Sequence, residues 1–168
     1  AASVWEVRGA SLFIPEEDYG FYSLSALATI IFCERGLPFL YQGQEIGMSN
    51  RQWKYDEFND LETINQYQIA LKAGMSKEQA LEIARHHSRD NARTPMQWSS
   101  EENAGFSKGK PWMPVNENYK VVNVAEEEKE YGSILNFYKR LIAFYKSEEY
   151  NEILTYGDFR PIYEKEDH

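Results

Sequence analysis

Apolar side chains at helical spacing are the first regular feature of the chain. Between Asp18 and Arg35 they recur at positions 24, 27, 28, 31 and 32, which lie on one face of a helix. Gly36 follows at once, and glycine commonly lies just beyond a helix end. The pattern predicts an amphipathic helix from about Asp18 to Arg35.

A short apolar run without polar alternation comes next, Leu37-Pro38-Phe39-Leu40-Tyr41. Such a run is typical of a strand buried on both faces, as in a parallel sheet covered by helices. A helix, a tight turn and a doubly buried strand together make up an αβ repeat. We therefore expect a buried strand over 37–41, followed by a glycine-punctuated polar loop over 42–47.

The rest of the chain predicts more helices and one long loop. Apolar spacing favours helices over 60–73 and 133–146, and Ser76 with Gln79 forms a capping box for a helix that ends near Ser88. That helix should carry Ala80, Ile83, Ala84 and His87 on one side. The acidic residues 126–130 suit a solvated helix start, and residues 90–124 predict a long ordered loop. A strand is expected to begin at Tyr156.

Charge and cysteine content narrow the class of protein. The net charge is −9 and no basic run is present, which argues against nucleic acid and anionic membranes as partners. No apolar stretch approaches the length of a membrane span, and the N-terminus does not have the pattern of a signal peptide. The one cysteine, Cys33, lies in an apolar stretch and is expected in the core. We expect a soluble, cytoplasmic globular protein.

Two long motifs are more specific than periodicity. The first is Gly36-Leu37-Pro38-Phe39-Leu40-Tyr41-Gln42-Gly43-Gln44-Glu45-Ile46-Gly47-Met48, and the second is Arg89-Asp90-Asn91-Ala92-Arg93-Thr94-Pro95-Met96-Gln97-Trp98, followed by Asn103-Ala104-Gly105-Phe106 and Pro111-Trp112. In this order and separation they closely resemble glycoside hydrolase family 13. The resemblance is to its branch of oligo-1,6-glucosidases, α-glucosidases and trehalose-6-phosphate hydrolases.

The resemblance implies an α/β fold, the C-terminal part of a TIM barrel. On that basis residues 19–35 are the seventh barrel helix, 37–41 the eighth strand, 48–131 a long excursion over the active-site face and 133–146 the eighth helix. Residues 1–150 would then belong to the catalytic barrel, and residues 151–168 would begin a C-terminal β-domain. The piece itself should consist mostly of helix and loop.

The resemblance also implies a retaining α-glucosidase, which uses two carboxyl groups about 5 Å apart. In the family the nucleophile and the acid lie on the fourth and fifth strands, which precede the matching region. A third aspartate lies in an Asn-His-Asp-Gln-Pro-Arg motif, where this chain has Ser3-Val4-Trp5-Glu6-Val7-Arg8, and only Arg8 fits. We therefore assign no catalytic residue and expect the isolated chain not to be a hydrolase.

Two arginines are the candidate substrate-binding residues. Arg89 and Arg93 lie four apart and would share a face if the preceding helix continued. Guanidinium groups donate to sugar hydroxyls and pair with carboxylates. The resemblance places this segment beside the subsite of the leaving sugar. The alternative is a salt bridge between an arginine and Asp90 that fixes the loop.

Other chemistry-bearing side chains receive structural roles. Glu45, after the predicted strand, is expected to accept hydrogen bonds from backbone groups of the turn. Trp98 and Trp112 are expected to anchor the long loop, with stacking on sugar rings as the alternative. His86 and His87 are adjacent and so make poor joint metal ligands, and no metal or cofactor motif is present.

Three interpretations of function stay open. The first is a piece of an α-glucosidase that acts on α-gluco-oligosaccharides. The second is a non-catalytic protein that binds carbohydrate or a partner, and the third is one half of a split hydrolase. The unpaired strand and exposed helix faces would favour self-association. The preference for α-1,6, α-1,4 or trehalose-6-phosphate linkages is not expressed in these residues.

Overall fold

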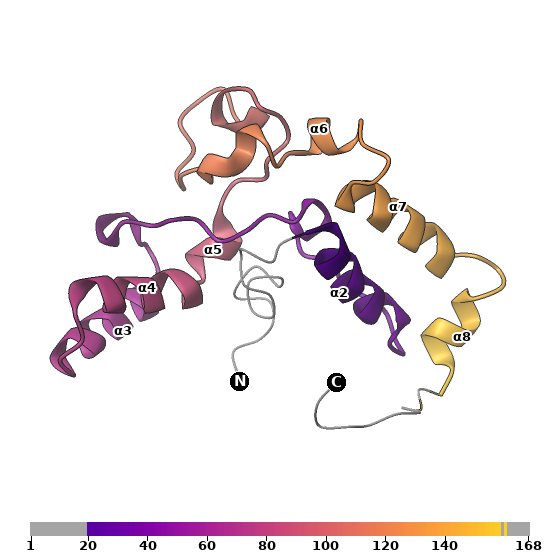
Figure 1. The fold of residues 1–168 in the computed structure, drawn as a ribbon, viewed down its shortest axis with the longest axis horizontal. Helices are drawn as coiled ribbons and strands as arrows, with labels where there is room; N and C mark the ends of the chain where they lie inside the picture. Colours follow the sequence, from indigo (N-terminus) through magenta and orange to yellow (C-terminus); the bar gives the residue numbers. More distant parts are fainter. Residues whose placement is uncertain (1–19, 159, 161–168) are drawn as a thin grey trace.

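The computed structural model describes residues 20–158 and 160, and its regular elements are helices (Figure 1). In chain order the elements are α2 (Phe21–Cys33), η2 (Gln44–Ile46), η3 (Tyr55–Glu57), α3 (Leu61–Lys72), α4 (Lys77–His87), α5 (Asp90–Arg93), η4 (Glu102–Gly105), η5 (Glu117–Lys120), α6 (Val124–Glu127), α7 (Ile134–Tyr145) and α8 (Asn151–Tyr156). The helices predicted over 60–73, 76–88 and 133–146 are confirmed as α3, α4 and α7. The helix predicted over 18–35 is confirmed as α2 from Phe21 to Cys33, and residues 18 and 19 lie outside the described residues.

One body of the molecule is the packing of α2 on α7 (Figure 1). Ala28 and Phe32 of α2 are buried against Tyr138, Leu141 and Tyr145 of α7. The ring of Phe32 meets those of Tyr138 and Tyr145 edge-on, at centroid distances of 6.1 and 5.9 Å. The apolar stripes predicted on both helices therefore meet and form a common core.

A second body is the antiparallel hairpin of α3 and α4, at the other side of Figure 1. Ser76 caps α4 by accepting from the backbone N–H of Gln79, whose side chain accepts from the N–H of Ser76 in return, as the capping box predicts. Ala80 and Ala84 are buried as predicted, but Ile83 and His87 are exposed. The buried face of α4 is therefore narrower than its sequence indicates.

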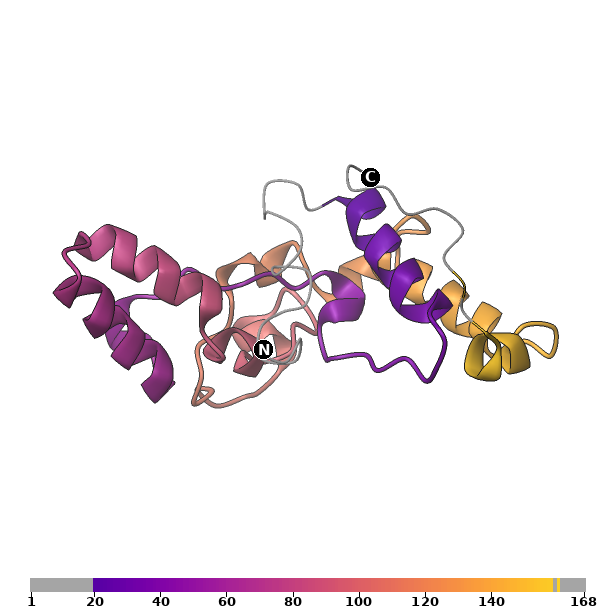
Figure 2. The ribbon, with the colours of Figure 1, turned by 90° about the horizontal axis from the view of Figure 1, so that it is seen from below.

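Irregular chain fills the space between these bodies, and Figure 2 shows it between the hairpin and α2. Trp53, from the segment before α3, and Met113, from the long loop, are both fully buried in the core beneath the hairpin. Ile46, Met48, Met96 and Leu135 form a third cluster, which joins η2 and the long loop to α7. The predicted loop over 90–124 is thus ordered, but it also contains α5, η4 and η5.

The buried strand predicted over 37–41 is wrong for the described chain. No residue of 20–158 is in a strand, and the side chains of Leu37 and Phe39 are 69% and 64% exposed. A strand needs a neighbouring strand to pair its backbone groups, and the described residues supply none. The backbone N–H of Tyr41 donates instead to the side chain of Gln44, at 3.2 Å.

Two further expectations meet the structure near the ends of α2 and α7. Cys33 is exposed rather than buried, because the side of α2 that contacts α7 carries Ala28 and Phe32. Residues 151–156 form α8, and Leu154 packs against the α2–α7 core. The strand expected to begin at Tyr156 does not begin there, because Tyr156 ends α8 and the described residues 157, 158 and 160 are not in a strand. The rest of that expected strand lies outside the described residues, and the domain boundary at residue 150 stays a prediction.

Candidate functional site

The arginine segment begins where α4 ends. α4 ends at His87 with Ser88 as its cap, and α5 begins anew at Asp90. The preceding helix therefore does not continue to Arg93, and the condition under which Arg89 and Arg93 would share one helix face is not met. Arg89 lies at the N-cap of α5 and Arg93 is its last residue.

Asp90 is the buried anchor of this segment, with a side chain that is 0% exposed. Its Oδ2 accepts from the backbone N–H groups of Asn59 and Asp60, at 2.7 and 2.9 Å. Its Oδ1 accepts from Nη1 of Arg93 at 3.1 Å. A buried carboxylate with several such donors is well satisfied, so Asp90 fixes both the start of α3 and the position of Arg93.

Arg89 forms a second ion pair, with Asp60. Nε and Nη2 of Arg89 donate to Oδ1 of Asp60, at 3.1 and 2.5 Å, and the hydroxyl of Thr63 donates to its Oδ2 at 2.7 Å. Burial alone would raise the pKa of Asp60, but these hydrogen bonds and the charge of Arg89 outweigh it and lower the pKa to about 2. Arg89 thus holds α5 against the start of α3.

The side chain of Arg93 is more exposed to solvent than that of Arg89. Its side chain is 43% exposed, against 34% for Arg89. Within the described residues its single hydrogen bond is the one to Asp90, so most of its five N–H donors remain for a ligand. The salt bridge weighed as the alternative to ligand binding is present, yet it uses only one end of the guanidinium fork.

Asn91, between the two arginines, is a buried structural residue whose contacts sequence reasoning missed. Its side chain is fully buried, and its Oδ1 accepts from the indole Nε1 of Trp53 at 2.7 Å and from the backbone N–H of Arg51 at 3.2 Å. Its Nδ2 donates to the carbonyl of Arg85 at 2.7 Å. These partners are between 6 and 40 positions away, so no local pattern announces them.

The segment after α2 reaches the same site through one hydrogen bond. The hydroxyl of Tyr41 donates to the carbonyl oxygen of Ala92 in α5, at 2.9 Å. Tyr41 and Ala92 are 51 positions apart in sequence, so this hydrogen bond brings the two motifs into contact. A ligand held by Arg93 would lie near the chain that follows α2.

Several other sequence candidates do not take the roles expected of them. Gln44, rather than Glu45, accepts a hydrogen bond from the turn, and no backbone donor to Glu45 occurs among the described residues. Trp98 and Trp112 are 50% and 78% exposed, so neither is a fully buried anchor of the long loop, whereas Trp53, in the segment before α3, is fully buried in the core. Three or more metal-ligating side chains do not gather anywhere in residues 20–158.

A second group of ionisable side chains lies at the junction of α6, α7 and η2. The carboxylate of Glu127 accepts from the backbone N–H of Leu135 at 2.9 Å. Burial raises the pKa of Glu127 to about 7, against this hydrogen bond and with help from the charge of Glu45. Burial also raises the pKa of Tyr138 well above its ordinary value. These residues were not singled out in the sequence.

In the part of the chain that the structure describes, no helix is long and apolar enough to cross a membrane.

Comparison with known proteins identifies the family. The chain is 39% identical to an oligo-1,6-glucosidase of Parageobacillus thermoglucosidasius, over 94% of this chain and 28% of that enzyme. The trehalose-6-phosphate hydrolase of Bacillus licheniformis superposes with a TM-score of 0.82 at 40% identity, over 90% of this chain and 27% of the other. The trehalulose synthase of Pseudomonas mesoacidophila MX-45 superposes with a TM-score of 0.81 at 38% identity, over 93% of this chain and 28% of the synthase.

The chain thus spans little more than a quarter of the length of these relatives. The model of the α-amylase catalytic domain matches residues 6–157, which is most of the sequence. The protein belongs to the α-amylase family of glycoside hydrolases, family 13.

Proposed function

We propose that this chain supplies part of the sugar-pocket wall of a retaining α-glucosidase that hydrolyses α-glucosidic bonds in oligosaccharides. The observation that carries the proposal is the state of Arg93. Its guanidinium is paired with the buried Asp90, yet the Arg93 side chain is 43% exposed and most of its donors are uncommitted in the described structure. A fixed, partly exposed guanidinium suits hydroxyl recognition at low entropic cost.

Arg89 is proposed as a weaker contributor to the same wall. Two of its nitrogens are already committed to Asp60, and Nη2 also lies 3.5 Å from Glu62. The main effect of Arg89 would then be to place α5, and with it Arg93, relative to α3. Substrate contact through Arg89 itself would need the guanidinium to donate from its outer edge.

We further propose that the 168 residues do not hydrolyse glycosides by themselves. The resemblance places the nucleophile and the acid outside the matching segment, and the segment at Ser3–Arg8 lacks the family's third aspartate. Residues 3–8 lie outside the described structure. The proposal treats the chain as a cytoplasmic protein, in keeping with its single cysteine.

A chimera tests this function. Residues 20–158 would replace the matching segment of the P. thermoglucosidasius oligo-1,6-glucosidase, and hydrolysis of isomaltose, maltose and trehalose 6-phosphate would be measured. The proposal predicts turnover of at least one α-glucoside by the chimera and none by the isolated chain. A folded chimera without turnover, or turnover by the isolated chain after removal of host glucosidases, contradicts it.

Self-association of the isolated chain is also proposed. Ile30, Leu37 and Ile153 are between 56% and 69% exposed near one end of the α2–α7–α8 body. Exposed apolar side chains in such numbers favour association, because their burial is worth about 25 cal/mol per Å2. Light scattering at increasing concentration measures it directly.

A further inference from the structure

A hollow on the long loop is separate from the Arg93 site. It has a volume of about 530 Å3, within the range of small-ligand pockets, and Arg93 does not line it. Its walls come from the segment before α3, from η4, from η5 and from the chain between η4 and η5. The lining residues that matter are Glu57, Asn103, Glu102, Lys110, Trp112 and Tyr119.

Trp112 is exposed on a fixed backbone. Trp112 is 78% exposed, while the next residue, Met113, is fully buried in the core with Trp53. The side-chain amide of Asn59 also donates to the sulfur of Met113, at 3.4 Å. An aromatic ring of this size is usually largely buried, so its exposure beside a fixed anchor leaves a flat apolar surface available to a ligand.

The opposite wall is held in a strained conformation. Asn103 and Ala104 have φ values of 53° and 58°, in the left-handed region that residues other than glycine rarely occupy. Ala104 is fully buried, and the Asn103 amide donates to the carbonyls of Ser107 and Gly109 at 3.1 and 3.3 Å. Such strain persists where surrounding contacts enforce it, and it is concentrated at ligand sites. Here it fixes the chain that leads to Lys110 and Trp112.

The polar groups of the hollow suit a neutral ligand. Glu57 is neutralised by Arg51, with Nη1 at 2.6 Å from its Oε2. Glu102 and Lys110 contribute opposite charges. Within the described residues the side chains of Lys110, Trp112 and Tyr119 make no hydrogen bond to other groups of the chain. The hollow therefore offers donors and acceptors without a net charge to attract an anion or a cation.

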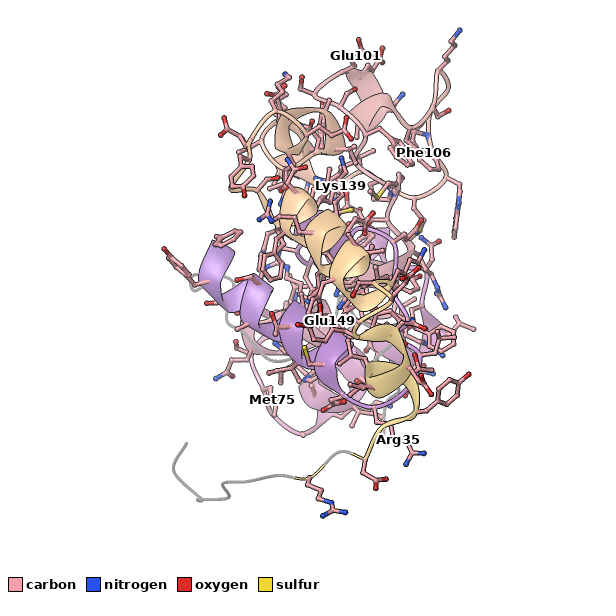
Figure 3. All side chains as sticks on the ribbon, turned by 90° about the vertical axis from the view of Figure 1, so that its right-hand side faces the viewer. Arg35, Met75, Glu101, Phe106, Lys139 and Glu149 are labelled. Carbon is pink, nitrogen blue, oxygen red and sulfur yellow. The ribbon has the colours of Figure 1, made fainter. Side chains whose placement is uncertain are left out.

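We propose that this hollow binds a neutral oligosaccharide, with one sugar ring stacked on the indole of Trp112. The flat apolar face of a pyranose ring covers an aromatic ring, while its hydroxyls pair with groups such as those of Tyr119, Lys110 and Glu102. Figure 3 shows the loops that carry the labelled Glu101 and Phe106 at the opposite end of the view from Arg35. The hollow would be a second sugar contact, separate from Arg93, because Arg93 is not among the residues that line it.

The test is titration of the 15N-labelled chain with maltotriose, isomaltotriose and cellotriose, followed by 15N–1H NMR. We expect an α-linked trisaccharide to shift the indole N–H resonance that Trp112→Ala removes. Trp112→Ala should weaken binding at least tenfold and Tyr119→Phe two- to fivefold. The matched control is Trp98→Ala, since Trp98 is a half-exposed tryptophan of the same loop outside the hollow, and it should change affinity less than twofold.

The indole resonance of Trp53 reports whether each variant remains folded, because this group is buried and bonded to Asn91 at 2.7 Å. Absence of binding by all three sugars, or equal loss in Trp98→Ala and Trp112→Ala, overturns the inference. The choice of α-linked probes rests on the proposed function. Binding of cellotriose alone would support a sugar site at Trp112 and contradict the preference for α-linked sugars. An inactive chimera together with Trp112-dependent binding would contradict the proposed function and leave the sugar site supported.

Discussion

The ion pair of Asp60 and Arg89 makes the stability of the chain depend on acidity in a defined way. The pKa of Asp60 falls from 3.8 to about 2 in the folded chain. The contribution of ionised Asp60 to the free energy of unfolding is therefore fully present above its pKa in the unfolded chain, and it is lost as the pH falls from about 4 through about 2. A difference of nearly two pKa units corresponds to about 2.4 kcal/mol. The Asp60 side chain is only 4% exposed, so screening by solvent should reduce this value little.

The perturbation that tests this is Asp60→Asn, which keeps an acceptor for Arg89 but removes the charge. We expect the free energy of unfolding at pH 7 to fall by about 2 kcal/mol, with a flatter dependence on pH below 4. Urea unfolding followed by circular dichroism, from pH 7 to pH 2.5, measures both. The matched control is Glu62→Gln, since Glu62 is 60% exposed and lies 3.5 Å from the same Nη2. An exposed pair of this kind is worth about 0–1 kcal/mol.

The reasoning is refuted if Asp60→Asn and Glu62→Gln lower the free energy of unfolding by the same amount. It is also refuted if the loss of stability below pH 4 is as steep in Asp60→Asn as in the parent chain. Either result would mean that Asp60 does not hold its charge through Arg89. The role of Arg89 in placing α5 would then lose its support.

Three further predictions concern single residues. Glu127→Gln should stabilise the chain by up to about 3 kcal/mol above pH 7. The raised pKa of Glu127 makes the stability of the parent chain fall as the pH rises from 4.5 through about 7, and glutamine does not ionise. Urea unfolding at pH 5 and pH 8 measures the difference. Asn91→Ala should cost about 2–3 kcal/mol by leaving the buried indole N–H of Trp53 unpaired, seen as a lower urea midpoint. Leu37→Lys should bring the mass measured by light scattering towards 19.7 kDa, since Leu37 is 69% exposed.

Each has an outcome that counts against it. Equal stabilisation at pH 5 and pH 8 would show that Glu127 does not titrate near neutrality. An Asn91→Ala chain as stable as the parent would mean that solvent replaces the amide. For Leu37→Lys, an unchanged mass above that of one chain would place the contact elsewhere, and Lys139→Ala, on the exposed side of α7, serves as its control.

The sequence predicted the helices well because their causes are local. The apolar stripe of α7 and the capping box of Ser76 depend on residues three or four apart, and both appear as expected. The strand over 37–41 failed because a strand is stabilised by a neighbour, which may lie anywhere in the chain or outside it. The prediction that Cys33 is buried failed for a related reason, since only the packing of α2 on α7 decides which side of α2 is covered.

The candidate site was foreseen in its residues but not in its geometry. The motif drew attention to Arg89 and Arg93, and whether they contact substrate stays a prediction. Their partners Asp60 and Asp90 are respectively 29 and 3 positions away, and only folding reveals which carboxylate each arginine meets. The fully buried Trp53 could not be told from the exposed Trp98 and Trp112 by composition, because a lone tryptophan in a loop gives no periodic signal.

The measurement that tests the central claim most directly is kcat/KM of the chimera on isomaltose with changes at Arg93. We predict that Arg93→Ala lowers kcat/KM at least tenfold. Arg93→Lys should also lower kcat/KM, because lysine keeps the positive charge beside Asp90 but lacks the fork of donors. Arg140→Ala, which removes an exposed guanidinium that lies over Tyr131, should leave kcat/KM within twofold. Full activity of Arg93→Ala, or full rescue by Arg93→Lys, would contradict a role for this guanidinium in the sugar pocket.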